Sequence, residues 1–368
     1  PTSFFHRFRS LSYATARRVN GKGTYEYLRQ EFPQVLFHNL MEKGFFMEIA
    51  VIIPSKNGIT HLKECLPTVV KAARKAPFPV HITVVDDNST DKTMEILSPL
   101  FPEVVFLRNS KKGASSARNW GVKNTPCDWI CFLDNDVFLD ENFFNTVQKY
   151  LKQDVFCVDC AGYTAYPKVS GALEQNDGIK LLEWKRGFLR FTGNIYNKEL
   201  PLQPEYLSWG VQGAYFFCNR NKFDRLCGFD EIFGPYMLEE TDMVYRGLKR
   251  GWKIVYAPDT KPLHKCGGTI DSKKNKYTQF LSKRNRVLFV WKNITSKSLF
   301  ISHVFWLLLR PNFKVLKSIW KFLPDIRNRR AIEIKEQMLT DKELLKQSKY
   351  FRQKCMSAML QKTLKGEI

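Results

Sequence analysis

The sequence predicts an α/β fold built on a mostly parallel central sheet. Between residues 49 and 133, short apolar runs rich in β-branched residues alternate with segments of helical periodicity. Polar and acidic clusters follow directly after these runs, at the strand ends where α/β sheets bind ligands. The chain has 368 residues, of which 44% are hydrophobic, so it can bury a substantial core.

The elements of the first half are bounded by turn-forming residues such as Pro54 and Pro77. In chain order we expect strand 49–53, helix 59–75, strand 81–85, helix 92–97, strand 104–107, helix 114–122 and strand 129–133. Because crossovers between parallel strands are right-handed, helices should cover both faces of the sheet.

Aromatic residues and glycines are frequent beyond residue 150, above all in residues 205–236, where we expect a ligand pocket. A helix is predicted at Glu240–Arg250 and a final strand at Trp252–Tyr256. From about residue 277 the pattern is helical and basic.

The charge is concentrated at the two ends of the chain. Residues 47–260 carry 26 basic and 26 acidic side chains, residues 1–46 carry 7 and 3, and residues 261–368 carry 25 and 7. A basic tail beside a neutral body favours an anionic membrane surface over nucleic acid as a partner.

Two C-terminal segments bear on that membrane hypothesis. Residues 312–323 read as one amphipathic helix with Phe313, Leu316, Trp320 and Leu323 on one face. The alternative is that this face packs on the rest of the protein. The apolar run 299–309 has 11 residues, against about 20 needed to cross a bilayer.

The nine cysteines form no repeating framework, which favours a reducing compartment over a disulfide scaffold. Cys157 and Cys160 form a CxxC in an apolar context, and no second pair follows at zinc-ligand spacing. We therefore interpret both as strand residues. No secretory signal is recognised in the first 25 residues, which lack a continuous apolar stretch.

Asp134-Asn135-Asp136 follows the fourth strand and is the strongest candidate for a metal site. Hard divalent cations prefer carboxylate oxygens, so Asp136 is expected to hold a metal and Asp134 the metal or a ribose. Such a pair is also common in turns. His264, much later in the chain, is a candidate metal ligand through its neutral imidazole, and the alternative is a structural role.

Nucleotide contacts are expected from the loops after the first strands. Pro54, Ser55 and Asn57 follow the first strand, and Asp86 and Asp87 follow the second, where their carboxylates can accept hydrogen bonds from a base or ribose. An Asx turn is the alternative. Further along, the expected diphosphate contacts are Lys112, Gly113 and Arg118, although a solvated loop would look similar.

Glu239, Glu240 and Asp242 lie at the start of the predicted helix that ends at Arg250. A carboxylate here could remove a proton from an attacking hydroxyl. The alternative is that acids in a first turn simply stabilise the helix dipole.

The whole arrangement resembles the family 2 glycosyltransferases, which have the GT-A fold. The resemblance runs from about Ile49 to Asn293 and rests on motifs in the expected order: VIIPSKN, VVDDNSTDKT, NSKKGASSARNWGV, ICFLDNDVFL, WGVQGAYFFCNR with GFDEIF, and LEETDMVYRGLKRGWKIVYAPDTKPLHKCGG.

The resemblance implies an inverting transfer of a sugar from a nucleotide-diphosphate donor. It implies donor recognition through Pro54, Asp86 and Asp87, metal and diphosphate contacts from Asp134 and Asp136, and a general base in the Glu239-Glu240 pair. The family usually shows Glu-Asp at that pair, so Glu240 occupies the position of the base. A divalent metal, Mg²⁺ or Mn²⁺, is the expected cofactor.

We therefore expect a basic extension at 1–46, a catalytic domain at 47–276 with a donor half at 47–150 and an acceptor half at 151–276, and a helical basic region at 277–368. The expected role is synthesis of a bacterial surface polysaccharide at the inner face of the plasma membrane. The acceptor would be a saccharide or lipid-linked saccharide.

Two other functions stay open. A nucleotidyltransferase would need a glycine-rich phosphate loop near the first strand, where only Gly58 occurs. A noncatalytic nucleotide- or polyanion-binding protein would use the basic ends as its working surface.

Overall fold

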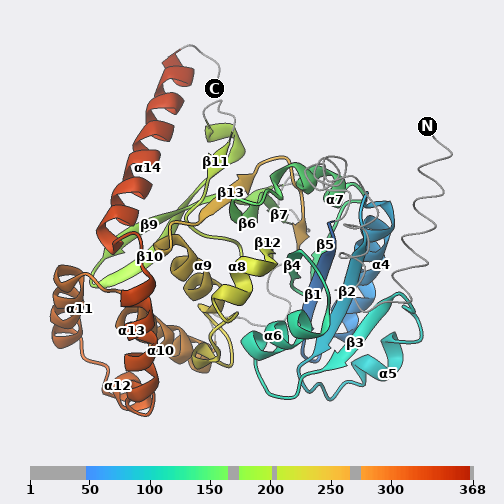
Figure 1. Ribbon diagram of the computed structural model, residues 1–368, viewed down its shortest axis with the longest axis horizontal. Coiled ribbons are helices and arrows are strands. Elements are labelled where there is room, and N and C mark those ends of the chain that lie inside the picture. Colours follow the sequence, from blue (N-terminus) through green and yellow to red (C-terminus); the bar gives the residue numbers. More distant parts are fainter. Residues whose placement is uncertain (1–46, 165–173, 201–204, 266–274, 365–368) are drawn as a thin grey trace, which may run out of the picture.

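The structure, a computed structural model, describes residues 47–164, 174–200, 205–265 and 275–364 (Figure 1). The predicted extension 1–46 lies outside the described residues. Eight of the described strands form one sheet in the order β11-β13-β6-β12-β4-β1-β2-β3. The α/β fold class is therefore confirmed.

The first half of the sheet matches the predicted elements closely. Strands β1 (Ile49–Ser55), β2 (Val80–Asp86), β3 (Val104–Arg108) and β4 (Trp129–Leu133) are parallel. Between them run helices α4 (Ile59–Lys75), α5 (Thr93–Leu97) and α6 (Ala114–Asn124). Local patterns suffice here because apolar runs and helical spacing coincide with burial.

Alternate residues of β1 serve the two faces of the sheet. Val51 belongs to the core that includes α4, and Ile52 to the core that includes α6. Gly121 lets α6 approach closely, because a Cβ there would lie 2.6 Å from Cγ2 of Ile52.

The second half adds antiparallel strands, so the sheet is mixed, but it remains mostly parallel as predicted. Strand β12 (Tyr215–Asn219) lies between β4 and β6 (Val155–Cys160) and runs antiparallel to both. Strand β13 (Lys253–Ala257) is parallel to β6, and β11 (Tyr206–Leu207) is antiparallel to β13. Cys157 and Cys160 are buried residues of β6 with free thiols, as predicted.

A smaller sheet follows the order β5-β14-β7-β8. Its strands are β5 (Val137–Phe138), β7 (Gly162–Thr164), β8 (Gln175–Asp177) and β14 (Leu263–His264). The prediction that Trp252–Tyr256 contains the final strand is therefore wrong. Strand β14 was too short for a periodicity signal, yet it pairs His264 with Val137.

The remaining elements belong to the rest of the chain and to its C-terminal region. They are α7 (Phe143–Val147), η1 (Gln148–Tyr150), β9 (Ile179–Lys185), β10 (Phe188–Ile195), η2 (Asn197–Glu199), α8 (Arg220–Arg225), η3 (Glu231–Phe233), α9 (Glu239–Lys249), α10 (Lys276–Asn293), α11 (Lys297–Leu309), α12 (Phe313–Trp320), α13 (Leu323–Glu336) and α14 (Asp341–Leu364).

The C-terminal region is helical, as predicted, and packs beside the β9-β10 hairpin (Figure 1). The predicted helix 312–323 is divided, since α12 ends at Trp320 and α13 begins at Leu323. Val315 and Ile319 form the buried face of α12, whereas Phe313 and Trp320 are exposed. Among the described helices, none combines the length and the apolar character that crossing a membrane requires.

Candidate active site

Three side chains gather where β4 and β14 end. Ligand atoms of Asp134, Asp136 and His264 lie within 4.8 Å of one another. Nε2 of His264 is 3.2 Å from Oδ1 of Asp136. Burial acts to raise the pKa of Asp136, but the hydrogen bond and charge of His264 outweigh it and the pKa is lowered. Two carboxylates and one imidazole suit a cation such as Mn²⁺, so the donor set fits a divalent metal.

The loop after β1 contacts both neighbouring strand ends. Nδ2 of Asn135 donates to Oγ of Ser55 at 2.9 Å, and a Cβ at Gly58 would lie 2.1 Å from that same Nδ2. Oδ1 of Asn57 accepts from N of Thr90 at 2.7 Å. The three predicted loops therefore meet at one edge of the sheet.

Asp86 and Asp87 are both buried and engaged within the loops. The carboxylate of Asp86 accepts from N of Ser89 at 3.3 Å, which is the Asx-type contact considered above. Asp87 accepts from N of Gly113 at 3.0 Å and from Nδ2 of Asn109 at 2.8 Å. Asp87 thus holds the loop of Lys112 and Gly113 against the end of β2.

Gly113 lies at the start of α6 with a φ of 110°, which favours glycine. A Cβ there would lie 3.0 Å from O of Pro235, and N of Ala114 donates to that oxygen at 2.8 Å. Lys112 beside it is exposed. This contact joins the donor-side loop to the segment that precedes α9.

Arg118 bridges two acidic motifs that are far apart in the sequence. Nη2 donates to Oδ1 of Asp134 at 2.8 Å, and Nη1 donates to Oε1 of Glu239 at 2.9 Å. Arg118 and Glu239 are both buried. The sequence predicts a diphosphate contact for Arg118. In the structure its guanidinium donates to these two carboxylates and, from Nη2, to O of Gly213 at 3.4 Å, which suits it to position both motifs.

Glu240 differs from its neighbour because it is only partly buried. Burial and the adjacent Glu239 carboxylate raise the pKa of Glu240 to about 7. Its side chain lies over Gly213, where a Cβ would be 3.2 Å from Cδ of Glu240. A group with this pKa can exchange protons at neutral pH.

Asp242, the third predicted catalytic acid, is fully enclosed. It accepts from Nζ of Lys292 at 2.7 Å, from Nδ2 of Asn293 at 2.7 Å and from Nε of Arg246 at 2.8 Å. These contacts join α9 to α10. The geometry therefore gives Asp242 a structural role rather than contact with a substrate.

Asn285 on α10 was missed by the sequence analysis. Its Nδ2 donates to backbone oxygens of Phe233, Tyr236 and Met237 at 2.7, 3.1 and 2.8 Å. Met237 and Leu238 have φ values of 84° and 70°, which are costly for side chains of this size. Asn285 thus fixes the strained turn that leads into Glu239, a contact that no local pattern could reveal.

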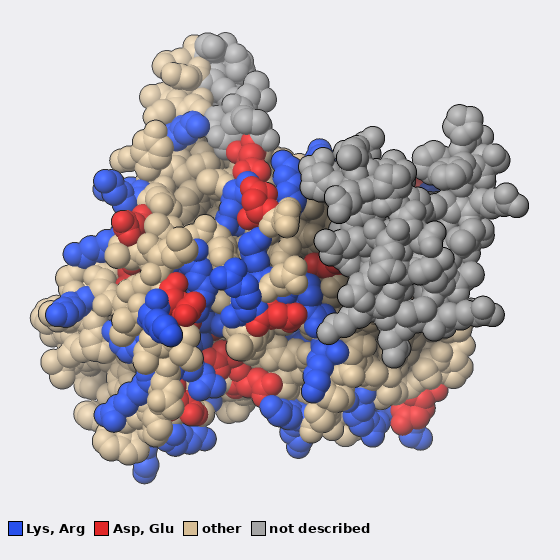
Figure 2. All heavy atoms as spheres, viewed as in Figure 1, with Lys and Arg blue, Asp and Glu red and all other residues tan. Residues whose placement is uncertain are grey.

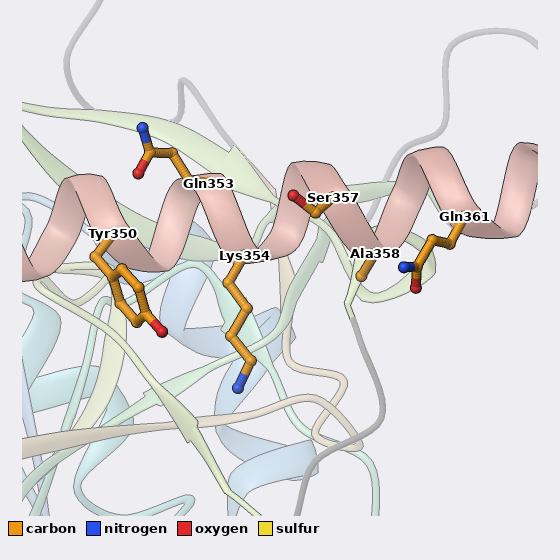
Figure 3. Close-up of a pocket in the computed structure, with 6 residues that line it drawn as sticks. All are labelled: Tyr350, Gln353, Lys354, Ser357, Ala358 and Gln361. Atoms are coloured by element: carbon orange, nitrogen blue, oxygen red, sulfur yellow. The ribbon is translucent and has the colours of Figure 1, made fainter.

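A pocket elsewhere is lined by one face of α14: Tyr350, Gln353, Lys354, Ser357, Ala358 and Gln361 (Figure 3). Of the residues that the structure describes, no Asp or Glu lines it. We therefore place the chemistry at the sheet edge.

The sheet, its crossovers and the acidic edge define the GT-A fold. The crystal structure of GalNAc-T7 with UDP, GalNAc and Mn²⁺ superposes with a TM-score of 0.62 at 17% identity, covering 83% of this chain and 57% of that one. Residues 50–226 match the profile of Glycosyl transferase family 2. This region is a family 2 glycosyltransferase domain, as predicted.

Curated relatives share the same region. Glycosyltransferase GlyA of Streptococcus pneumoniae serotype 4 is 26% identical over 127 residues, 34% of this chain and 18% of that protein. Minor teichoic acid biosynthesis protein GgaB of Bacillus subtilis is 29% identical over 117 residues, 30% of this chain and 13% of that protein. The chain thus spans less than a fifth of the length of either relative.

Proposed function

We propose that this chain transfers a sugar, with inversion, from a nucleoside diphosphate donor to a hydroxyl of a saccharide or lipid-linked saccharide. The observation that carries the proposal is the single acidic edge in which Arg118 connects Asp134 to Glu239, beside Glu240. It unites a metal-type donor set with a carboxylate that titrates near neutral pH.

In the proposed reaction the acceptor hydroxyl attacks the anomeric carbon. Its proton passes to the carboxylate of Glu240, while the bond from that carbon to the diphosphate oxygen breaks and the nucleoside diphosphate leaves. Asp134, Asp136 and His264 would hold Mn²⁺ or Mg²⁺, which neutralises charge on a departing diphosphate. Glu239 is less suited to act as base, since Arg118 holds its carboxylate in a buried ion pair.

The loops after β1 and β2 would bind the nucleoside part of the donor through Pro54, Ser55, Asn57, Asp86 and Asp87. Lys112, Gly113 and Arg118 border the expected diphosphate position, with Arg118 acting mainly through Asp134. Support comes from the contacts that hold these loops together at the sheet edge.

Surface polysaccharide synthesis at the cytoplasmic face of the membrane is the proposed setting. A relative named for minor teichoic acid biosynthesis supports a role in cell-surface polymers. The basic C-terminal region supports association with an anionic membrane.

Thermal shift against a panel of nucleotide sugars, with and without MnCl₂, tests donor and metal together. A ligand that binds the native state raises the apparent melting temperature with the logarithm of the ligand concentration. We expect Mn²⁺ to strengthen the shift in the wild type and to have no such effect in Asp136→Ala, which should also lose transfer. Normal turnover by Asp136→Ala would overturn the metal assignment.

Product analysis separates the competing functions. Release of nucleoside diphosphate with the opposite anomeric configuration in the product, read by NMR, is expected. Release of pyrophosphate would indicate a nucleotidyltransferase. Donor binding without any turnover over a broad acceptor panel would indicate a noncatalytic nucleotide-binding protein.

A further inference from the structure

The inner face of α11 is unusually polar. His303 is fully buried, and its Nδ1 lies 2.7 Å from O of Gly187 on the β9-β10 hairpin. Nε1 of Trp291 donates to Nε2 of His303 at 3.1 Å. Because an indole N–H only donates, Nε2 is the acceptor and the proton of the neutral ring is on Nδ1. Burial lowers the pKa of His303, in agreement with the neutral form.

The outer face of α11 is apolar and exposed. We define the apolar ridge as Ile301, Val304, Phe305 and Leu308, which are 69%, 40%, 55% and 75% exposed. Their spacing of three, four and seven residues aligns them along one side of the helix. A helix on a water-exposed surface normally directs its apolar side chains to the core and its polar side chains to the solvent. Because α11 does the opposite, the ridge marks an interaction surface.

Helix α12 extends this surface. Phe313 and Trp320 are 76% and 75% exposed, although Val315 and Ile319 anchor the opposite side of α12 in the core. Both helices lie at the left and lower edge of the molecule, away from β3 and α5 (Figure 1).

The segment that contains α11 and α12 carries charge of one sign. Residues 276–324 contain ten basic side chains and no acidic one. Five exposed cations lie on or beside α11 and α12: Lys297, Arg310, Lys314, Lys317 and Lys321. Figure 2 shows many blue side chains and fewer red ones among the tan surface of this lower left part. Two copies meeting ridge to ridge would bring like charges together, whereas an anionic lipid surface complements them.

We propose that α11 and α12 form a membrane-docking surface that inserts the apolar ridge into the interface of an anionic bilayer leaflet. With 13 residues, α11 is shorter than the roughly 20 residues of a spanning helix, so it would lie along the surface. Trp320 would then sit at the headgroup boundary and the flanking lysines would contact lipid phosphates. This proposal refines the membrane association proposed above, and its test does not depend on sugar transfer.

Vesicle flotation with the full chain tests it. The vesicles are phosphatidylcholine alone, or phosphatidylcholine with about 30% phosphatidylglycerol. We expect binding to the anionic vesicles that falls about tenfold or more in Ile301→Ser/Phe305→Ser/Leu308→Ser and in Lys314→Glu/Lys317→Glu/Lys321→Glu. These positions are exposed, so folding should be retained, as circular dichroism can check.

The matched control is Leu100→Ser/Val105→Ser, which removes apolar side chains that are 61% and 52% exposed on the opposite side of the molecule. This variant should bind like the wild type. Absence of vesicle binding, or wild-type binding by the ridge variant, would overturn the proposal. So would a dimer in size-exclusion chromatography that the ridge variant loses while no vesicles are bound.

Discussion

The two adjacent glutamates at the start of α9 differ in what surrounds their carboxylates. Glu239 is buried and paired with Arg118, whereas Glu240 is partly exposed and has its pKa raised to about 7 by burial and by Glu239. Neighbouring carboxylates with separated environments divide structural and proton-transfer roles. The pair therefore explains why Glu240 is the proposed base.

Replacing Glu240 by Gln should lower kcat by about 10² to 10⁴, because the carboxylate that accepts the proton is lost. In the wild type only the ionised form is active, so kcat/KM should fall as pH drops below about 7 and level off above it. Steady-state kinetics across pH, with donor affinity from calorimetry, measures this. Donor affinity should persist, and Glu95→Gln on α5 is the control. Wild-type turnover by the Gln variant would move the base elsewhere.

Arg118→Met should destabilise the fold by roughly 3–5 kcal/mol, because it leaves the buried Glu239 carboxylate without its cation. Adding Glu239→Gln should recover part of this loss, so that the two changes couple by about 1 kcal/mol or more. Urea denaturation of both single variants and the double variant measures the coupling. Strictly additive effects would argue against a functional ion pair.

At the scale of elements, α10 is part of the site although it lies far from the donor loops in the chain. Its Asn285 donates to three backbone oxygens of the turn before α9, and its Lys292 and Asn293 hold Asp242. The position of Glu240 thus depends on a helix that carries no motif of its own.

Asn285→Ala should cost about 1–3 kcal/mol of unfolding free energy, since backbone oxygens lose their donor. The turn with positive φ at Met237 and Leu238 should relax, so kcat should fall by roughly tenfold or more while donor affinity stays near wild type. Thermal denaturation and kinetics measure both. Lys283→Ala, an exposed position on the same helix, serves as the control. Equal kcat in both variants would show that the turn keeps its conformation without the amide of Asn285.

At the scale of the whole molecule, buried ion pairs connect the C-terminal helices to α9 and to the residue before η3. Besides Asp242, the carboxylate of Asp230 lies 2.8 Å from Nζ of Lys292, and Asp341 at the start of α14 lies 3.3 Å from Nζ of Lys249 on α9. Removing either side would leave charge buried without a partner.

Truncation after residue 276 should therefore abolish cooperative unfolding, because Asp230 and Asp242 lose Lys292. Truncation after residue 355 should leave the melting temperature within a few degrees of the full chain, since Phe351 and Cys355 are the last buried side chains among the described residues. Circular dichroism melts of both fragments measure this. A sharp transition in the shorter fragment would mean that the sheet is stable alone.

The sequence was sufficient to predict the elements of the first half of the sheet. It was insufficient to predict contacts between residues that are far apart in the chain. Strands β1 to β4 are local apolar runs, and the acids that follow them necessarily share one edge. The antiparallel β12, the bridge from Arg118 to Glu239 and the amide of Asn285 depend on pairings between residues about 50 to 120 positions apart. The apolar run 299–309 was also evident from the sequence, but not that much of its apolar surface faces outward in α11.

The hydrogen bonds from Asn285 to the turn before Glu239 affect the design of chimeras between this chain and its relatives. The family match ends at residue 226, before this turn begins. A chimera that kept this turn and took α10 and the later helices from a relative would replace the partner of the turn. The turn would therefore keep its conformation only if the incoming helix brings an amide to the same position.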